Sequence, residues 1–266
     1  MHLRSPTLAS TSGRRAISPV ESSDSNCYVT KFQNNPQHVR VLANEMLATR
    51  LGLALGLPIP KVEIIDVSAW LIEHTEELRI RLAGHSIPCR SGKQLGSLYT
   101  GCPGMTLDYL PQELLGKVRN VDDFARVLVL DKWTCNADGR QSTFWRRTPR
   151  SRRYNATFID QGYCFNAREW NFPDLALHGT YYHNWVYQNV SGWDSFEPTL
   201  SRIERIGEQD LWNCARDIPT EWYENDSSAL SRLIEELYKR TSRVRALITN
   251  FRDSTRAPFP NWSQGR

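Results

Sequence analysis

A strand, a helix and a second strand follow one another early in this 266-residue chain. Residues 27–32 alternate between β-favouring types and predict a strand. Between Val39 and Leu55 apolar residues recur at helical spacing, and the pattern stops at Gly56. Residues 61–67 are rich in valine and isoleucine and predict the second strand. This order is typical of a small lobe of the α+β class.

Helical patterns dominate the second half of the chain. Residues 121–133 predict a strong helix, because two aspartates occupy its first turn and apolar residues follow at helical spacing. Residues 144–145 and 156–159 predict two paired strands around an arginine-rich turn. Further segments with helical spacing are 200–206, 229–238 and 243–251. A larger, mostly helical lobe is therefore expected after the first one.

These patterns divide the chain into three parts. Residues 1–26 are rich in Ser, Pro, Thr and Arg, and they predict a poorly ordered lead. Residues 27–110 form the expected small lobe, in which 73–104 predict loops and 105–110 a strand. Residues 111–266 form the expected larger lobe.

Composition and charge are typical of a globular protein and do not favour a membrane-spanning or nucleic-acid-binding one. The 40% hydrophobic and 23% charged content is ordinary for a globular chain. No apolar run reaches about 18 residues, so no membrane span is expected. The net charge of +4 is mild, and five arginines between positions 146 and 153 supply much of it. Such a run is typical of a solvated turn, so direct binding of nucleic acid is not expected.

The cysteines and histidines show no metal-binding spacing. The six cysteines are scattered without a C-x-x-C pair, and His178 and His183 stand five residues apart in an aromatic stretch. No zinc or iron site is therefore expected. Free thiols in a chain of this size favour a cytoplasmic location.

Four ionisable residues lie on predicted elements that suit the roles needed for phosphoryl transfer. Lys31 sits in the first predicted strand, and Glu45 follows 14 residues later in the helix behind it. Asp138 lies in a polar loop after the 121–133 helix, and Asp160 ends an apolar strand. Phosphoryl transfer needs a cation on the phosphates, a carboxylate that holds this cation, a base for the nucleophile and an acidic metal ligand. The ordered set fits a phosphoryl-transfer site.

Each of these residues also has a simple structural interpretation. Lys31 alone is typical of a surface strand lysine, and Glu45 of an exposed helix position. Asp138 precedes Gly139, a dipeptide that favours turns, and Asp160 before a Gln-Gly pair is compatible with a strand-end cap. These alternatives stay open at the level of sequence.

Two further features predict structure rather than chemistry. Asp131 lies on the apolar 121–133 helix, and a buried aspartate needs a partner. We expect a hydrogen bond from Asp131 to the loop formed by residues 136–140. The aromatic residues between Trp170 and Trp193 are expected to form core of the larger lobe.

Several motifs, taken in order, resemble the HipA-like kinase family. The first are Tyr28-Val29-Thr30-Lys31-Phe32, Asn44-Glu45 and Gly56-Leu57-Pro58-Ile59-Pro60. The later ones are Asp131-Lys132-Trp133-Thr134-Cys135-Asn136-Ala137-Asp138-Gly139-Arg140 and Phe158-Ile159-Asp160-Gln161-Gly162. The resemblance covers residues 27–166, about half of the chain, and rests on the order of the motifs rather than on any one of them.

The resemblance implies a bilobal kinase-like fold that binds ATP with Mg²⁺ and transfers phosphate to a protein hydroxyl. Carried over by position, Lys31 would pair the nucleotide phosphates and Glu45 would orient Lys31. Asp138 would be the catalytic carboxylate, and Asp160 would hold magnesium.

The same resemblance assigns a hinge and a class of partner. Residues 105–110 would link the lobes, with Tyr109 and Leu110 nearest to the adenine. The substrate would be a protein, and an antitoxin-like or regulatory protein would be a further partner.

Two departures from the family pattern concern the handling of phosphate. The family has a metal-binding asparagine five residues after the catalytic aspartate, where this chain has Thr143. Either Gln141 or Thr143 would supply the metal-binding oxygen, or the second metal would be held weakly. The family also has a phosphate loop before the lysine strand, for which this chain offers only Ser10-Thr11-Ser12-Gly13. A non-catalytic, nucleotide-binding pseudokinase therefore stays open beside the kinase, and a lipid or small-molecule kinase is a third alternative.

Overall fold

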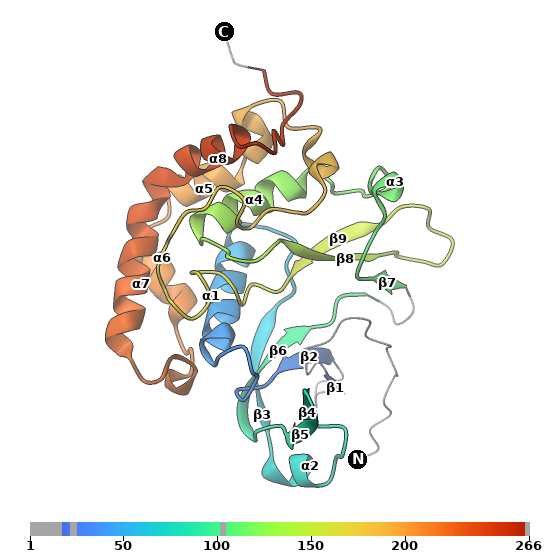
Figure 1. Ribbon diagram of the computed structural model, residues 1–266, viewed down its shortest axis with the longest axis vertical. Helices are drawn as coiled ribbons and strands as arrows, with labels where there is room; N and C mark the ends of the chain where they lie inside the picture. Colours follow the sequence, from blue (N-terminus) through green and yellow to red (C-terminus); the bar gives the residue numbers. More distant parts are fainter. Residues whose placement is uncertain (1–17, 22–25, 102–104, 264–266) are drawn as a thin grey trace.

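A computed structural model describes residues 18–21, 26–101 and 105–263 (Figure 1). A four-stranded sheet lies at one end of the molecule and the long helices lie at the other, with a three-stranded sheet beside the helices. The expected α+β fold, with a small mixed lobe and a larger helical lobe, is confirmed.

Within the described residues the strands form three sheets, in which all neighbouring pairs are antiparallel. The first sheet has the order β1 (Ser18–Glu21), β2 (Cys27–Lys31), β6 (Gly92–Leu98) and β3 (Val62–Val67). The second is the hairpin of β4 (Arg79–Leu82) and β5 (His85–Pro88). The third contains β7 (Thr106–Leu107), β8 (Gln141–Trp145) and β9 (Asn155–Ile159).

Helices form in all five segments for which helical spacing predicted them, and three α-helices that were not predicted form in addition among the described residues. Those of the first half are α1 (Arg40–Ala54), α2 (Ala69–Glu73), α3 (Gln112–Leu115) and α4 (Asp123–Trp133). Those of the second half are α5 (Thr199–Glu204), α6 (Glu208–Ala215), α7 (Ser227–Arg240) and α8 (Val244–Arg252). Short 3₁₀ turns are η1 (Asn184–Tyr187), η2 (Trp193–Phe196), η3 (Thr220–Tyr223) and η4 (Thr241–Arg243). No helix in the described ranges combines the length and apolar character that crossing a bilayer requires.

The edge strand β1 corrects part of the expectation for residues 1–26. Its backbone pairs with β2, from Ser18 opposite Thr30 to Glu21 opposite Cys27. Four residues are too few to show a periodic pattern, so this strand is specified by the free edge of β2 rather than by its own sequence. Residues 1–17, which include the expected phosphate-loop segment Ser10–Gly13, lie outside the described residues.

The expectation of loops over residues 73–104 was wrong, because β4, β5 and β6 fall within this range. β6 is an inner strand that pairs with β2 on one side and β3 on the other. It contains two glycines, a lysine and a glutamine, which weaken the strand signal. Gly96 has a packing role, since a Cβ there would lie 2.1 Å from Cδ1 of Ile65 on β3. Tertiary packing thus overrides local propensity.

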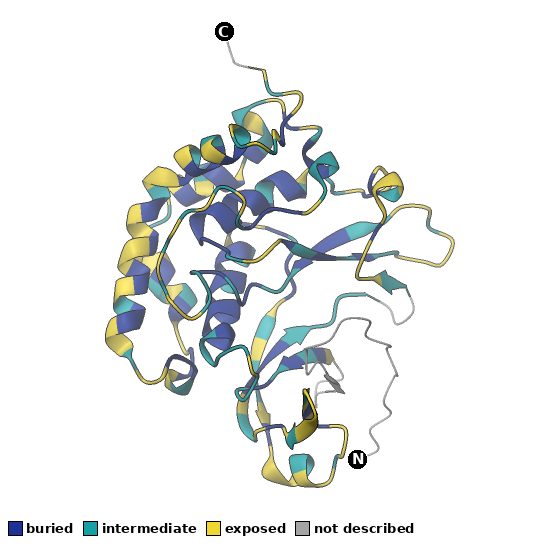
Figure 2. Cartoon of the chain, in the orientation of Figure 1, coloured by how far each residue is buried: buried dark blue, intermediate teal, exposed yellow. Residues whose placement is uncertain are grey.

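The helices α1 and α4 are buried on almost every side, whereas α6, α7 and α8 expose their outer faces (Figure 2). α1 packs against β3 and β6 and also against α6 and η3, so it lies between the small sheet and the large lobe. An apolar helix in such a position is expected to be buried all round. Both helices nevertheless carry buried polar residues, among them Glu45 on α1 and Asp131 on α4, and each of these needs a partner.

Candidate active site

Lys31 lies between two carboxylates that come from different parts of the chain. Its Nζ is 2.6 Å from Oε2 of Glu45 on α1 and 2.7 Å from Oδ1 of Asp160 at the end of β9. The side chains of Lys31, Glu45 and Asp160 are only 14%, 4% and 8% exposed. Burial alone would lower the pKa of Lys31, but the two carboxylates outweigh this effect and raise it above its ordinary value. Lys31 is therefore a fixed, fully charged cation.

Asp160 reaches Lys31 from an unusual backbone conformation. Its φ is +63°, in the left-handed region that non-glycine residues rarely adopt. Such a conformation costs on the order of 1 kcal/mol and persists only where the surroundings impose it. The chain turns directly after β9, and this turn presents the carboxylate to β2.

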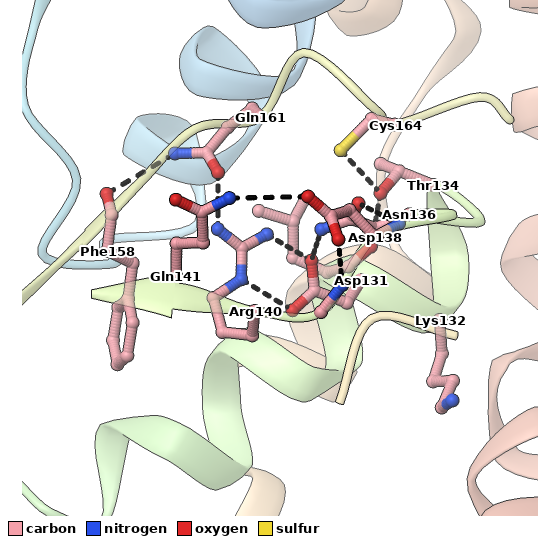
Figure 3. Close-up of polar contacts among 12 residues, drawn as sticks. Asp131, Lys132, Thr134, Asn136, Asp138, Arg140, Gln141, Phe158, Gln161 and Cys164 are labelled. Atoms are coloured by element: carbon pink, nitrogen blue, oxygen red, sulfur yellow. Dashed lines mark hydrogen bonds and ion pairs between the residues drawn. The ribbon is translucent and has the colours of Figure 1, made fainter. Parts of the chain in front are cut away.

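Asp138 lies in the loop between α4 and β8, where its side chain is exposed. One carboxylate oxygen accepts a hydrogen bond from the backbone N–H of Gly139 at 2.7 Å, and the other accepts one from Nε2 of Gln141 at 3.3 Å (Figure 3). The carbonyl of Asp138 accepts a hydrogen bond from the N–H of Gly179 at 3.0 Å. The loop is held in place, while the carboxylate remains accessible to a reactant.

A buried polar network lies under this loop (Figure 3). Asp131 accepts hydrogen bonds from Nδ2 of Asn136 and from Nε of Arg140, both at 2.9 Å, and it also pairs with Nη2 of Arg140. This confirms the predicted bond from Asp131 to the 136–140 loop. Arg140 and Gln161 were not singled out from the sequence. The sequence signal for Arg140 would have been its position close to Asp131, because a buried aspartate needs a partner.

Gln141 and Thr143 lie on one face of β8. They are half-buried and alternate with Ser142 and Phe144, which point into the core. Thr143 stands opposite Thr157 of β9. The structure therefore brings Gln141 into contact with Asp138, and it places Thr143 farther along the same strand face.

The expected hinge residues have different surroundings. Leu110 is fully buried in the core, and its carbonyl accepts a hydrogen bond from the hydroxyl of Tyr182 at 3.4 Å. Tyr109 is 56% exposed, and its ring stacks on that of Tyr182 with centroids 5.7 Å apart. The strand expected over 105–110 is reduced to the two residues of β7.

The oxygen donors at this site match the preferences of magnesium. The carboxylate of Asp160, the side-chain oxygen of Gln141 and the hydroxyl of Thr143 are hard ligands of the kind that Mg²⁺ selects. Among the described residues, no group of three or more His, Cys, Asp or Glu could hold a metal ion. A magnesium ion held by Asp160 and by Gln141 or Thr143 would have to complete its shell with phosphate oxygens and water, as is usual beside nucleotides.

Comparison with known proteins adds a family and a fold. The family model described as HipA-like kinase matches residues 19–251. No characterised protein matches the sequence significantly. Similarity to solved structures is low in sequence but extensive in fold.

Three solved structures illustrate this similarity. HipA of Shewanella oneidensis, from a toxin–antitoxin complex with HipB and operator DNA, is 14% identical with a TM-score of 0.53, over 92% of this chain and 67% of that one. A Golgi casein kinase with Mn and ADP bound is 12% identical with a TM-score of 0.51, over 92% and 72%. The proinflammatory kinase CtkA of Helicobacter pylori is 14% identical with a TM-score of 0.50, over 88% and 92%. The chain has a kinase-like fold.

Proposed function

Because the chain belongs to the HipA-like kinase family, we propose that it is an ATP-dependent phosphotransferase that acts on a protein hydroxyl. The observation that supports this most strongly is the pairing of Lys31 with both Glu45 and Asp160. Burying three charges together carries a large desolvation cost, so such a cluster adds little to the stability of the fold. A cation that is held ready at the point where two lobes meet is, in contrast, what phosphate binding requires.

Lys31 contacts the nucleotide phosphates in this proposal. Glu45 keeps the ammonium group of Lys31 in position, because its carboxylate comes from a helix that is itself buried. Asp160 holds magnesium, with Gln141 or Thr143 as a further oxygen donor. The metal ion, when bound, would neutralise charge that develops on the phosphates during transfer.

Asp138 orients the incoming hydroxyl and accepts its proton. Its carboxylate is exposed, while the backbone around it is anchored to Gly179 and to the buried Asn136. A positioned base needs this combination of a fixed loop and an accessible oxygen.

The proposed partners are proteins. The family supports a protein hydroxyl as acceptor, and the Shewanella protein forms a complex with HipB and operator DNA. For this chain, an antitoxin-like or regulatory protein is the corresponding proposal, and any DNA contact is assigned to that partner. A cytoplasmic location is part of the same proposal.

A nucleotide-binding pseudokinase is the second candidate, and one observation favours it. The position of the family's metal-binding asparagine is occupied by Thr143, which offers a hydroxyl where the family has an amide oxygen. The weaker ligand would reduce catalysis more than nucleotide binding, because the Lys31 cluster does not involve Thr143.

Magnesium-dependent transfer from ATP separates these functions. We expect Asp138→Asn to reduce turnover by about 10²- to 10⁴-fold and to leave ATP binding nearly unchanged. Asp194→Asn, at an exposed aspartate on η2, is the matched control and should leave both unchanged. Binding of ATP without transfer by the wild-type protein would favour the pseudokinase, and the absence of binding would contradict both candidates.

A further inference from the structure

We propose that Arg140 is a positioning residue that fixes Asp160 relative to Asp138. This inference rests on the proposed phosphotransferase function and adds to it a residue that touches neither substrate nor metal. Arg140 follows Asp138 by two residues in the loop, and its side chain reaches the turn that carries Asp160. One residue therefore connects the two carboxylates that the reaction would use.

The guanidinium of Arg140 forms hydrogen bonds with the residues on both sides of Asp160, and Figure 3 shows the bond to Gln161. Its Nη1 donates to the carbonyl of Ile159 at 3.0 Å and to Oε1 of Gln161. The Ile159 carbonyl belongs to the peptide unit that enters Asp160, so this bond restrains the orientation of Asp160 directly. Gln161 is fully buried, which leaves it little freedom to release the bond.

The backbone of Asp160 needs such a restraint. Its φ of +63° is unfavourable for a residue with a side chain, and a free turn would relax out of it. The two hydrogen bonds from Arg140 act on the preceding and the following residue. They therefore hold the conformation that directs the Asp160 carboxylate towards Lys31.

The same hydrogen-bond network also reaches the backbone of Asp138. Asp131 binds Arg140 through both carboxylate oxygens and accepts a further hydrogen bond from Nδ2 of Asn136 at 2.9 Å. Oδ1 of Asn136 accepts the backbone N–H of Asp138 at 3.2 Å. Asp131, Asn136 and Arg140 are no more than 3% exposed. The orientations of Asp138 and Asp160 thus depend on one buried ion pair.

A second buried arginine provides a comparison within the same lobe. Arg240 is 2% exposed, donates to the carbonyls of Lys132 and Trp133, and pairs with Asp174. It is similar to Arg140 in burial and bonding, but it holds the end of α4 and contacts neither Asp138 nor Asp160. Loss of Arg240 therefore reports the general cost of losing a buried arginine.

The test compares Arg140→Lys with Arg240→Lys. Lysine keeps the positive charge, but it lacks the planar fork that spans Asp131 on one side and Ile159 and Gln161 on the other. Both variants should lower the melting temperature. Only Arg140→Lys should accelerate amide hydrogen exchange in the 158–162 segment of the nucleotide-free protein. It should also raise the Mg²⁺ concentration for half-maximal ATP binding by about tenfold, which is typical when a metal ligand loses its supporting contact.

The result that would overturn the proposal is equal behaviour of the two variants in exchange of the 158–162 segment. If Arg140→Lys does not fold, Asp131→Asn with Arg140→Gln removes both charges together and should show the same local acceleration. If the wild-type protein shows no magnesium-dependent ATP binding, the proposed function fails. The exchange experiment needs no nucleotide, so it still decides whether Arg140 positions Asp160.

Discussion

Lys31 lies on a strand and pairs with one carboxylate from a helix and one from the end of another strand. Both carboxylates are almost completely shielded from water. We expect Lys31→Met to lose the ATP-induced rise in melting temperature. It should also cost about 3 kcal/mol of stability, because Glu45 and Asp160 are left as buried like charges. Differential scanning fluorimetry with and without MgATP measures both effects.

A double variant separates stability from binding in this experiment. Lys31→Met with Glu45→Gln removes one of the two stranded charges, so it should recover part of the lost stability and still show no response to ATP. A normal ATP-induced shift in Lys31→Met would contradict the assignment of Lys31 to the phosphates.

Lys132 makes the stability depend on pH in a defined window. Its ammonium donates to the carbonyls of Ala176 and His178, and burial lowers its pKa to about 8, although Asp131 and Asp174 oppose the effect. The unfolded chain binds a proton at Lys132 up to about pH 10.4, where the folded one has already lost it. Stability attributable to Lys132 should therefore rise with pH between about 8 and 10.

Urea unfolding of the wild-type protein and of Lys132→Met at several pH values checks this. Between pH 8 and pH 10 the free energy of unfolding of the wild type should rise by on the order of 2 kcal/mol relative to that of the variant. A constant difference between the two proteins would show that the ammonium of Lys132 keeps an ordinary pKa in the fold.

The sequence was sufficient to identify Lys31, Glu45, Asp138 and Asp160 as candidates, because each has a recognisable place on a strand, helix or loop. The structure brings Lys31, Glu45 and Asp160 into contact. The role of Arg140 could not be predicted, because its partners Asp131 and Gln161 are set by the path of a loop without periodicity. Contacts of that kind appear only once the chain is folded.

At the scale of secondary-structure elements, the predictions were correct where apolar periodicity extends over several turns. They failed where adjacent strands determine the structure of a segment. The helices α1, α4, α7 and α8 were found because their apolar faces repeat over several turns. β6 was missed, because an inner strand between two others needs little propensity of its own. β1 was missed for the related reason that it is specified by the edge of β2.

The role of β1 leads to a prediction about truncation. We expect removal of residues 1–21 to lower the melting temperature more than removal of residues 1–17, because only the longer deletion takes β1 from the edge of β2. Amide exchange in β2 should accelerate in the longer deletion alone, since its edge N–H groups lose their partners. Identical melting temperatures and identical exchange for the two truncated proteins would show that β1 contributes nothing to the sheet.

At the scale of the whole molecule, the site depends on contacts between the two lobes. Lys31 belongs to the small sheet and Asp160 follows β9 of the larger part, 129 residues later. α1 lies between them and supplies Glu45, so the three charges can meet only when both lobes are packed on this helix. Fold and candidate site are therefore coupled, which explains why the order of motifs along the chain was informative although no single motif was specific.

The central claim is that these residues form one binding site for ATP with magnesium, and calorimetric titration of ATP tests it most directly. The wild-type protein should bind ATP about tenfold more tightly with Mg²⁺ than with EDTA, and Asp160→Asn should lose that difference because a metal ligand is removed. Asp138→Asn should retain most of it. Equal affinity of the wild type with and without Mg²⁺, or an unchanged magnesium effect in Asp160→Asn, would contradict the account.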